Sequence, residues 1–197
     1  MADKTRNVKK PLENGTFTLY PLTPLFPLLF FSEHVVTIVY QNRVRPRSLT
    51  DHDMMELAIA EALKASREGE VPVGAVLVSA DEVVAKDHNR SLSQQDPTAH
   101  AEILVIREGA QRIGNYRLNG CELYLTIEPC PMCAGAIVHS RISRLIFGAR
   151  DPKSGAVVSL YHMLNDSRLN HHVQVTEGIQ TERCQEILQS FFYDRRG

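Results

Sequence analysis

The feature that most constrains the fold is an alternation, from residue 50 onward, of continuous apolar runs with amphipathic stretches. Apolar runs bounded by turn residues predict buried strands, and apolar residues at helical spacing predict helices that cover a sheet. On this basis we expect helices at 51–70, 98–113, 131–139 and 180–193, and strands at 71–78, 83–87, 121–127, 144–149 and 173–176. Strands that alternate with helices predict an α/β fold with helices on both faces of the sheet.

The first 50 residues differ from the rest in charge and composition. They carry seven basic and three acidic residues, so a segment of net charge +4 precedes a remainder of −5 in a chain of net charge −1. Their apolar stretch, 14–32, contains Pro21, Pro24 and Pro27. Because proline removes a backbone donor and breaks helices, we expect no membrane-spanning helix and no membrane partner. A nucleic-acid partner would need a local basic patch, since the chain has no global positive field.

Two short motifs contain the residues best suited to chemistry, PTAHAE at 97–102 and EPCPMC at 128–133. Alone, a Cys-x-x-Cys pair fits a redox site, half of a structural zinc site or two buried thiols, and a His-x-Glu motif says little. Each motif, however, lies where a loop enters an expected helix, with one helix and one strand between them. We therefore expect both helix starts side by side at one edge of the sheet, where helix dipoles favour metal-binding thiolates.

His100, Cys130 and Cys133 supply three protein ligands for one Zn²⁺ per subunit. A structural zinc site normally has four protein ligands, whereas a catalytic site leaves one position to water. Zinc lowers the pKa of that water toward about 7, which makes hydroxide available at neutral pH. Cys121 and Cys184, the other two of the four cysteines, could supply a fourth ligand but are expected in the core.

Glu102 lies two residues after His100 and is placed to move protons between the zinc-bound water and a substrate nitrogen. His-x-Glu combined with Pro-Cys-x-x-Cys is the established signature of the zinc-dependent nucleobase deaminases. In that chemistry zinc hydroxide attacks the ring carbon that bears the amino group, and the glutamate protonates a ring nitrogen and the departing ammonia. The motifs therefore predict a hydrolytic deaminase.

From about residue 54 to its C-terminus, the chain resembles the bacterial-type tRNA-specific adenosine deaminases of the cytidine/deoxycytidylate deaminase superfamily. The matching stretches are 71–76, 89–90, 96–102, 115–118, 125–136, 139–142, 147–151 and 191–192. The resemblance implies a cytidine deaminase-like fold, which is a three-layer α/β/α sandwich with a mixed five-stranded sheet. It also implies a cytoplasmic homodimer that converts adenosine to inosine at the wobble position of a tRNA anticodon.

The resemblance further implies residues that contact the tRNA anticodon stem-loop. Asn89 would hydrogen-bond the flipped base or its ribose, and Asp151 and Lys153 would meet the RNA backbone and sugars. For all three, an ordinary role in a loop or turn stays open. Phosphate contacts require basic side chains, and base stacking requires aromatic ones. The candidates are Arg150, Arg195 and Arg196 for phosphate and Phe191 and Phe192 for the substrate channel, with solvated arginines and core phenylalanines as the alternatives.

We interpret residues 1–48 as an N-terminal extension that is either disordered or the product of a start assigned too far upstream, and 49–197 as the zinc-dependent deaminase domain. Three other functions stay open. A deaminase of free guanine, cytosine or nucleosides would use the same zinc centre, but the segment 148–155 argues against it. A non-catalytic zinc- or RNA-binding module would not need Glu102. A thiol redox protein would not hold a stoichiometric zinc ion.

Overall fold

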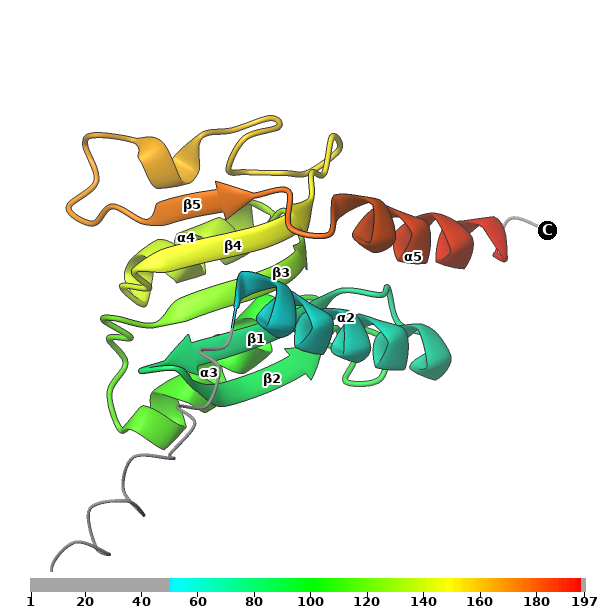
Figure 1. Cartoon of the computed structure of the whole chain (residues 1–197), viewed down its shortest axis with the longest axis horizontal. Helices are drawn as coiled ribbons and strands as arrows, with labels where there is room; N and C mark the ends of the chain where they lie inside the picture. The colour runs from blue at the N-terminus through cyan, green and yellow to red at the C-terminus, as the bar shows by residue number, and fades with distance from the viewer. Residues whose placement is uncertain (1–49, 196–197) are drawn as a thin grey trace, which may run out of the picture. The chain divides into compact units, whose positions relative to one another are not determined.

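In this computed structural model, residues 50–195 are described, so the expected extension at 1–48 and Arg196 lie outside the described residues. The elements, in chain order, are α2 (Asp51–Glu68), β1 (Gly74–Ser79), β2 (Glu82–His88), α3 (Ala101–Ile113), β3 (Glu122–Ile127), α4 (Pro131–His139), β4 (Arg144–Ala149), the short 3-10 helix η1 (Met163–Asn165), β5 (Gln174–Glu177) and α5 (Thr181–Tyr193) (Figure 1). Every helix and strand expected after residue 50 is present, with ends displaced by a few residues.

The five strands form one mixed sheet in the order β2-β1-β3-β4-β5. β1 pairs antiparallel with both β2 and β3, whereas β3 pairs parallel with β4, and β4 with β5. Parallel neighbours need a crossover connection, and α4 provides it between β3 and β4. The expected mixed five-stranded sheet is confirmed.

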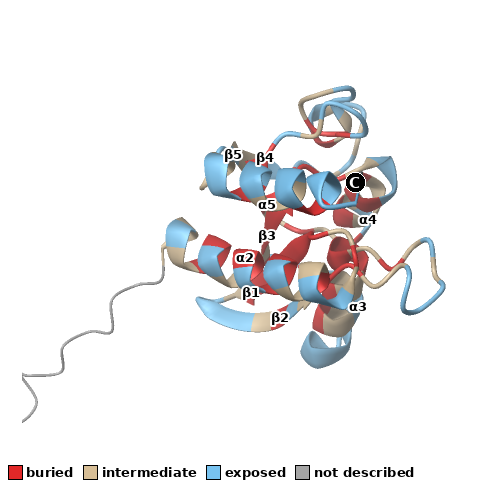
Figure 2. Ribbon diagram, turned by 90° about the vertical axis from the view of Figure 1, so that its right-hand side faces the viewer, coloured by how far each residue is buried: buried red, intermediate tan, exposed pale blue. Residues whose placement is uncertain are grey.

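The helices form two layers, with α2 and α5 on one face of the sheet and α3 and α4 on the other (Figures 1 and 2). The core is divided in the same way. In β1, Leu77 belongs to the cluster under α3 and α4, and its neighbour Val76 belongs to the cluster under α2 and α5. Successive strand side chains point to opposite faces, so a sheet covered on both sides has continuous apolar strands. The α/β/α sandwich is therefore confirmed, and Cys121 and Cys184 lie in its two core clusters.

The helix starts follow from local hydrogen bonds. At α2, Thr50 and Asp53 form a capping box, in which each side chain accepts a hydrogen bond from the backbone N–H of the other. At α3, the helix begins at Ala101 and not at Thr98 as expected. The side chain of Asp96 accepts hydrogen bonds from both the N–H and the hydroxyl of Thr98 at 2.7 Å. This local turn competes with the first helical turn and delays the helix by three residues.

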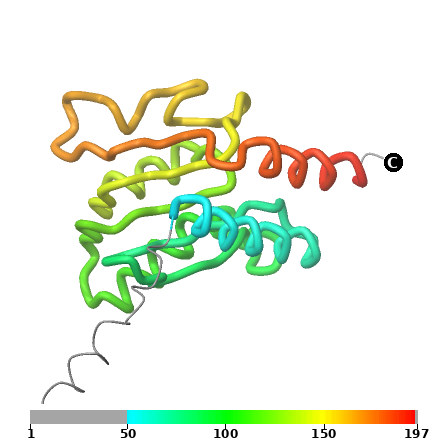
Figure 3. Tube along the Cα trace, viewed as in Figure 1, coloured from blue at the N-terminus to red at the C-terminus, as the bar shows by residue number. Residues whose placement is uncertain are grey.

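The chain returns repeatedly to one end of the sheet, where β2, β3 and β4 end and α3 and α4 begin (Figure 3). The long connection between β4 and β5 also leaves from this end, and α5 runs out beyond it. No helix within residues 50–195 has the length and apolar character needed to cross a bilayer.

Candidate active site

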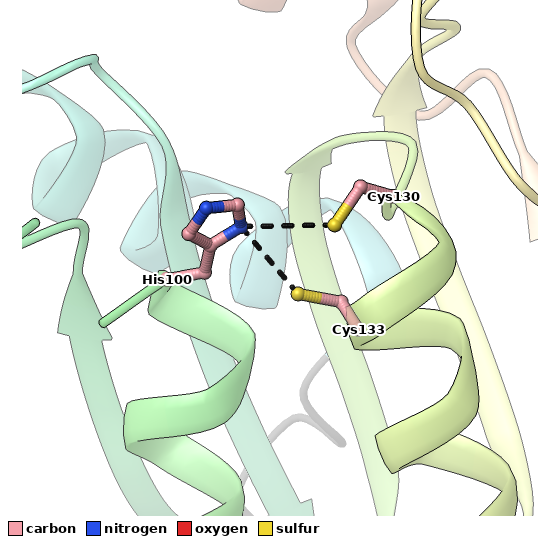
Figure 4. A group of neighbouring side chains, drawn as sticks. All are labelled: His100, Cys130 and Cys133. Atoms are coloured by element: carbon pink, nitrogen blue, oxygen red, sulfur yellow. Dashed lines mark hydrogen bonds between the residues drawn. The ribbon is translucent and has the colours of Figure 1, made fainter. Parts of the chain in front are cut away.

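His100, Cys130 and Cys133 meet at this end of the sheet (Figure 4). Nδ1 of His100 lies 3.8 Å from Sγ of Cys130 and 3.6 Å from Sγ of Cys133, and all three ligand atoms lie within 4.8 Å of one another. His100 is the N-cap residue of α3 and Cys130 that of α4, with Cys133 in the first turn of α4. The structure thus brings the three sequence-predicted ligands together from two helix starts.

The donor set fits a zinc ion. A tetrahedral zinc with bonds of about 2.1 Å to nitrogen and 2.3 Å to sulfur places neighbouring N and S atoms about 3.6 Å apart. The two observed N–S distances agree with this value. Among the described residues, no fourth His, Cys, Asp or Glu completes the group. Three protein ligands are typical of a zinc site that binds water or substrate in its fourth position.

The thiol of Cys130 is prepared for metal binding by its neighbours. Hydrogen bonds from Cys133, and secondarily from His100, outweigh burial and lower the pKa of the Cys130 thiol, while the same pairing raises the pKa of the Cys133 thiol. The positive end of the α4 dipole acts in the same direction. Since the thiolate is the form that binds metal, this position favours the ligand form near neutral pH.

Glu102 lies in the first turn of α3 and is 3% exposed. Burial raises the pKa of its carboxyl group. Within the described residues, its Oε2 is the buried side-chain oxygen or nitrogen that lacks a hydrogen-bond partner. Buried polar atoms are nearly always paired, so this oxygen is available to a group that enters the site.

A cavity of 910 Å³ joins the ligands to the surrounding loops. His100, Glu102 and Cys130 line its floor, together with the apolar side chains of Val73 and Ile127. The rest of the wall comes from the segment 89–91, the segment 149–154 and one face of α5. Ligand pockets typically have volumes of about 300–1,000 Å³ and mostly apolar walls with a few polar groups. The cavity has the size and composition of a substrate site.

Asn89 lines this cavity and also supports α3. It follows β2 and is 7% exposed, and its Oδ1 accepts a hydrogen bond of 2.9 Å from the N–H of Ala101. His100 makes no side-chain cap at this helix, so Asn89 supplies the missing cap from a different part of the chain. Its amide NH₂ group remains as a donor for a ligand.

The loop after β2 is held by the buried carboxylate of Glu70. This carboxylate accepts hydrogen bonds from the N–H groups of Leu92 at 3.1 Å and Ser93 at 2.7 Å. Burial raises the pKa of Glu70, but these backbone donors outweigh it and hold the pKa below its usual value. The loop that carries Asn89 and Ser91 to the cavity is therefore anchored by a charged group.

The opposite wall is the loop after β4. Arg150, Asp151 and Lys153 all line the cavity. The guanidinium of Arg150 is held in a two-hydrogen-bond pair with Glu177, both at 2.7 Å, so its contact with a phosphate would compete with this ion pair. The carboxylate of Asp151 accepts a hydrogen bond from the N–H of Lys153 at 2.9 Å and so stabilises a turn. The side chain of Lys153 is exposed.

Near the C-terminus the structure separates the remaining candidates. Phe192 lines the cavity at 44% exposure, whereas Phe191 is buried at 6% and does not line it. Arg195 lies over the Phe191 ring at 4.0 Å and donates a hydrogen bond of 2.7 Å to the carbonyl of Gly69. Arg195 therefore lines a separate groove between α2 and α5 and not the cavity. Arg196 lies outside the described residues.

The sequence interpretation missed three residues of α5 and one carboxylate. Gln185, Leu188 and Gln189 line the cavity together with the expected Phe192, and the four follow the i, i+3, i+4, i+7 spacing of a helix face. That spacing is visible in the sequence and could have identified them. Glu128, directly after β3, also lines the cavity. The sequence feature that could have identified Glu128 is its position between an apolar strand and the cysteine motif.

Comparison with known proteins defines the class. The family described as the cytidine and deoxycytidylate deaminase zinc-binding region matches residues 48–149, about half of the chain. A guanine deaminase from Nitrosomonas europaea, at 19% identity, shares the fold with a TM-score of 0.65 over 87% of this chain and 98% of its own. The fold and the His/Cys/Cys group, taken with the family match, define a zinc-dependent deaminase with a zinc cofactor.

Closer relatives define the family within that class. Proteins named tRNA-specific adenosine deaminase match at 52% identity in Haemophilus influenzae and 47% in Bacillus subtilis, over 79% and 74% of this chain and 90% and 91% of theirs. A structure from a study of A-to-I editing by tRNA:A34 deaminases at the wobble position matches at 47% identity and TM-score 0.67, over 68% of this chain and 98% of its own. The chain belongs to the tRNA-specific adenosine deaminases, and the resemblance noted in the sequence is confirmed.

Proposed function

We propose that this protein hydrolyses adenosine to inosine and ammonia at the wobble position of a tRNA anticodon. The observation that carries the proposal is that His100, Cys130 and Glu102 line one cavity in a chain 52% identical to a tRNA-specific adenosine deaminase. Cys133 completes the ligand group with His100 and Cys130. The three ligand residues meet the reaction's requirement for a metal, and the buried carboxyl group of Glu102 meets its requirement for a proton carrier. The open wall of the cavity gives a polynucleotide access to both.

In this mechanism His100, Cys130 and Cys133 hold the metal, and Glu102 carries the protons. When bound, zinc supplies Lewis acidity that lowers the pKa of a water molecule toward about 7. Glu102 accepts a first proton from the attacking water through its unpaired Oε2 and donates it to a ring nitrogen. It then takes the second proton from that oxygen and donates it to the leaving amino group, which departs as ammonia. Its raised pKa, caused by burial, favours a carboxyl group that holds the transferred proton.

Asn89 and the apolar wall bind the base. The side-chain oxygen of Asn89 is occupied by Ala101, so its NH₂ group is the part that donates to the base or the ribose. Val73 and Ile127 supply apolar contacts for the faces of the ring. A base must leave its stack to reach this depth, which costs least in a single-stranded anticodon loop.

The rim of the cavity supports an RNA partner. Phe192 and Tyr193 are exposed at 44% and 81% and line the cavity from α5, where aromatic rings can stack on neighbouring bases. Lys153 and Arg150 are the basic groups of the opposite wall, and phosphate binding requires such groups. Asp151 in the same wall offers an acceptor for ribose hydroxyls.

We further propose a homodimer located in the cytoplasm. The described surface exposes the large apolar side chains of Leu92 and Tyr116, each at 68%, and Met132 at 37%, which an interface would cover. The cytoplasm is where a tRNA substrate is available. Sedimentation of the purified protein would measure the subunit number, and a monomer at all concentrations would contradict the dimer.

The decisive experiment incubates the purified zinc-loaded protein with total tRNA and reads inosine at the wobble position by sequencing. Free adenosine, guanine and cytosine serve as parallel substrates, because a free-base or nucleoside deaminase is the competing function with the same zinc centre. Inosine in tRNA at position 34 with unchanged free bases supports the proposal. Deamination of a free base with unmodified tRNA would contradict it.

A further inference from the structure

The carboxylate of Glu128 lies between the zinc-ligand motif and the loop 151–159. It follows β3 directly, two residues before the first cysteine of the motif, and the residue is 2% exposed. Its Oε1 accepts three backbone hydrogen bonds, of 3.0, 2.7 and 2.9 Å, from the N–H groups of Val157, Val158 and Ser159. Three donors on one oxygen leave it with no capacity to contact a substrate.

The second oxygen of Glu128 holds the other end of the loop. Oε2 accepts a hydrogen bond of 3.1 Å from the N–H of Asp151 and a short one from the hydroxyl of Ser159. The first and last residues of the loop are therefore tied to one carboxylate. Hydrogen bonds to a charged group are about twice as strong as neutral ones, so this carboxylate is a strong organiser of an otherwise irregular segment.

Gly155 gives the loop its close approach to Glu128. A Cβ atom added at Gly155 would lie 2.3 Å from Oε2 and 2.4 Å from Cδ of Glu128. It would also lie 2.6 Å from the backbone carbonyl oxygen of Asp151, so no side chain fits there unless the carboxylate and the loop backbone both move. The N–H of Gly155 also donates to the carbonyl of Asp151 at 2.9 Å, so the loop closes on itself around the carboxylate.

The loop that Glu128 anchors is one wall of the cavity. Its residues Asp151, Lys153 and Ser154 line the cavity opposite the segment that carries Asn89. Glu128 and Cys130 belong to the same three-residue connection between β3 and α4, and Cys133 follows in the first turn of α4. One short segment therefore positions both the two cysteine ligands and the substrate loop.

We propose that Glu128 is a positioning residue for RNA binding, which holds the loop 151–159 in the shape that presents Asp151 and Lys153 to the anticodon stem-loop. This inference rests on the proposed function and deepens it. Glu128 acts through the loop and not on the reacting atoms. Its loss is therefore expected to weaken substrate binding and to leave the zinc ligands and the chemical step in place.

A merely structural carboxylate would behave differently. It would lower the amount of folded, zinc-loaded protein and so reduce kcat with little change in KM. Asp51 provides the control, because its carboxylate is also held by hydrogen bonds from a distant part of the chain but lies at the opposite end of the sheet. Its carboxylate binds the guanidinium of Arg144, the first residue of β4, at 2.5 and 2.9 Å. Asp51→Asn should lower the Tm without a change in KM.

The experiment compares wild type, Glu128→Gln, Gly155→Ala and Asp51→Asn as zinc-loaded proteins. Zinc content, KM and kcat on an anticodon stem-loop RNA, and hydrogen exchange of backbone amides are measured for each. Glu128→Gln replaces one acceptor oxygen with an NH₂ group that faces donors, and Gly155→Ala places a methyl group against both the carboxylate and the carbonyl of Asp151. We expect both to raise KM roughly tenfold, the effect of losing about one charge-assisted hydrogen bond, with kcat and zinc nearly unchanged.

Hydrogen exchange gives a readout that does not depend on activity. The amides of Val157, Val158 and Ser159 should exchange faster in Glu128→Gln, while those of α3 keep their protection. If Glu128→Gln does not fold, Ser159→Ala removes one donor only and should give a smaller shift in KM in the same direction. An unchanged KM with unchanged exchange, or a loss of zinc and kcat at constant KM, would overturn the proposal. If the wild-type protein is inactive on the stem-loop, that result contradicts the proposed function instead. Hydrogen exchange of the backbone amides would then test on its own whether Glu128 anchors the loop 151–159.

Discussion

The side-chain oxygen of Asn89 accepts a hydrogen bond of 2.9 Å from the backbone N–H of Ala101, twelve residues further along the chain. This contact ties the end of β2 to the first turn of the helix that begins with a zinc ligand, His100. The Asn89 amide thus has two roles that can be separated. Its oxygen stabilises the helix start, and its NH₂ group is left for the proposed contact with substrate in the cavity that Asn89 lines.

Substitution of Asn89 should separate these roles. Asn89→Ala removes the cap and should lower the free energy of unfolding by about 1 kcal/mol, as loss of a helix cap does. Asn89→Asp keeps an acceptor for the N–H of Ala101 and should recover part of that stability, but it offers no NH₂ donor and should remain defective in turnover. Urea unfolding and initial rates on tRNA measure the two effects. Full activity of Asn89→Asp would contradict the proposed hydrogen bond from the NH₂ group of Asn89 to the substrate.

Glu102 is expected to transfer protons and not to bind the metal. Glu102→Ala should therefore keep one zinc per chain and lose roughly 10²- to 10⁴-fold in kcat, the usual contribution of general acid–base catalysis. Metal analysis and inosine formation are the two measurements. Glu102→Gln is the matched control for side-chain size, and it should be as inactive as the alanine variant. Zinc loss in both variants would show instead that Glu102 supports the ligand group.

The four cysteines should divide into two pairs by their effect on zinc. Cys130→Ser or Cys133→Ala should lose zinc and activity together, because each removes one of three ligand atoms. A strong chelator should do the same to the wild type, with recovery when zinc is added back. Cys121→Ala and Cys184→Ala are the controls, since both residues are buried away from the ligand group, and both should retain zinc. Deamination that survives complete zinc removal would contradict the role of the metal, and a purified protein without stoichiometric zinc would favour the thiol redox alternative.

Glu70 should contribute stability that depends on pH. Its pKa in the folded protein lies below the usual value of 4.5, because the N–H groups of Ser93 and Leu92 outweigh the effect of burial. A carboxyl group with a lowered pKa stabilises the fold fully above its unfolded pKa and loses that contribution as the pH falls through the folded pKa. Glu70→Gln should thus cost roughly 1.5–3 kcal/mol at neutral pH.

The difference between wild type and Glu70→Gln should narrow as the pH drops below 4.5. Urea unfolding at a series of pH values tests this. A difference that stays constant over the whole range would mean that the backbone contacts and not the charge of Glu70 hold the loop.

Removal of residues 1–48 should leave a folded, zinc-loaded and active protein. The family match begins at residue 48, and the capping box of Thr50 and Asp53 provides a complete start for α2. The Tm, zinc content and rate on tRNA of the truncated chain should equal those of the full chain. If the truncated chain loses zinc or activity, the extension is required for zinc binding or for catalysis.

The order of helices and strands was predictable because it depends on local patterns. Apolar runs such as the one around Leu77 mark a strand buried on both faces, and a stripe of apolar residues marks each helix. Helix ends were less predictable, since the turn formed by Asp96 and Thr98 depends on one side chain that competes with the helix. Arg196 and the extension at 1–48 lie outside the described residues and stay predictions.

The ligand set was predictable without a structure, because His100, Cys130 and Cys133 occupy spacings that few other chemistries require. The family was predictable in the same way, from the motifs around these residues. The surface that surrounds the ligand group, in contrast, depends on tertiary packing. The pairing of Arg150 with Glu177, the contact of Arg195 with Gly69 and the five donors on Glu128 all join residues more than 20 positions apart. Such contacts depend on how the elements pack, and no local pattern in the chain specifies them.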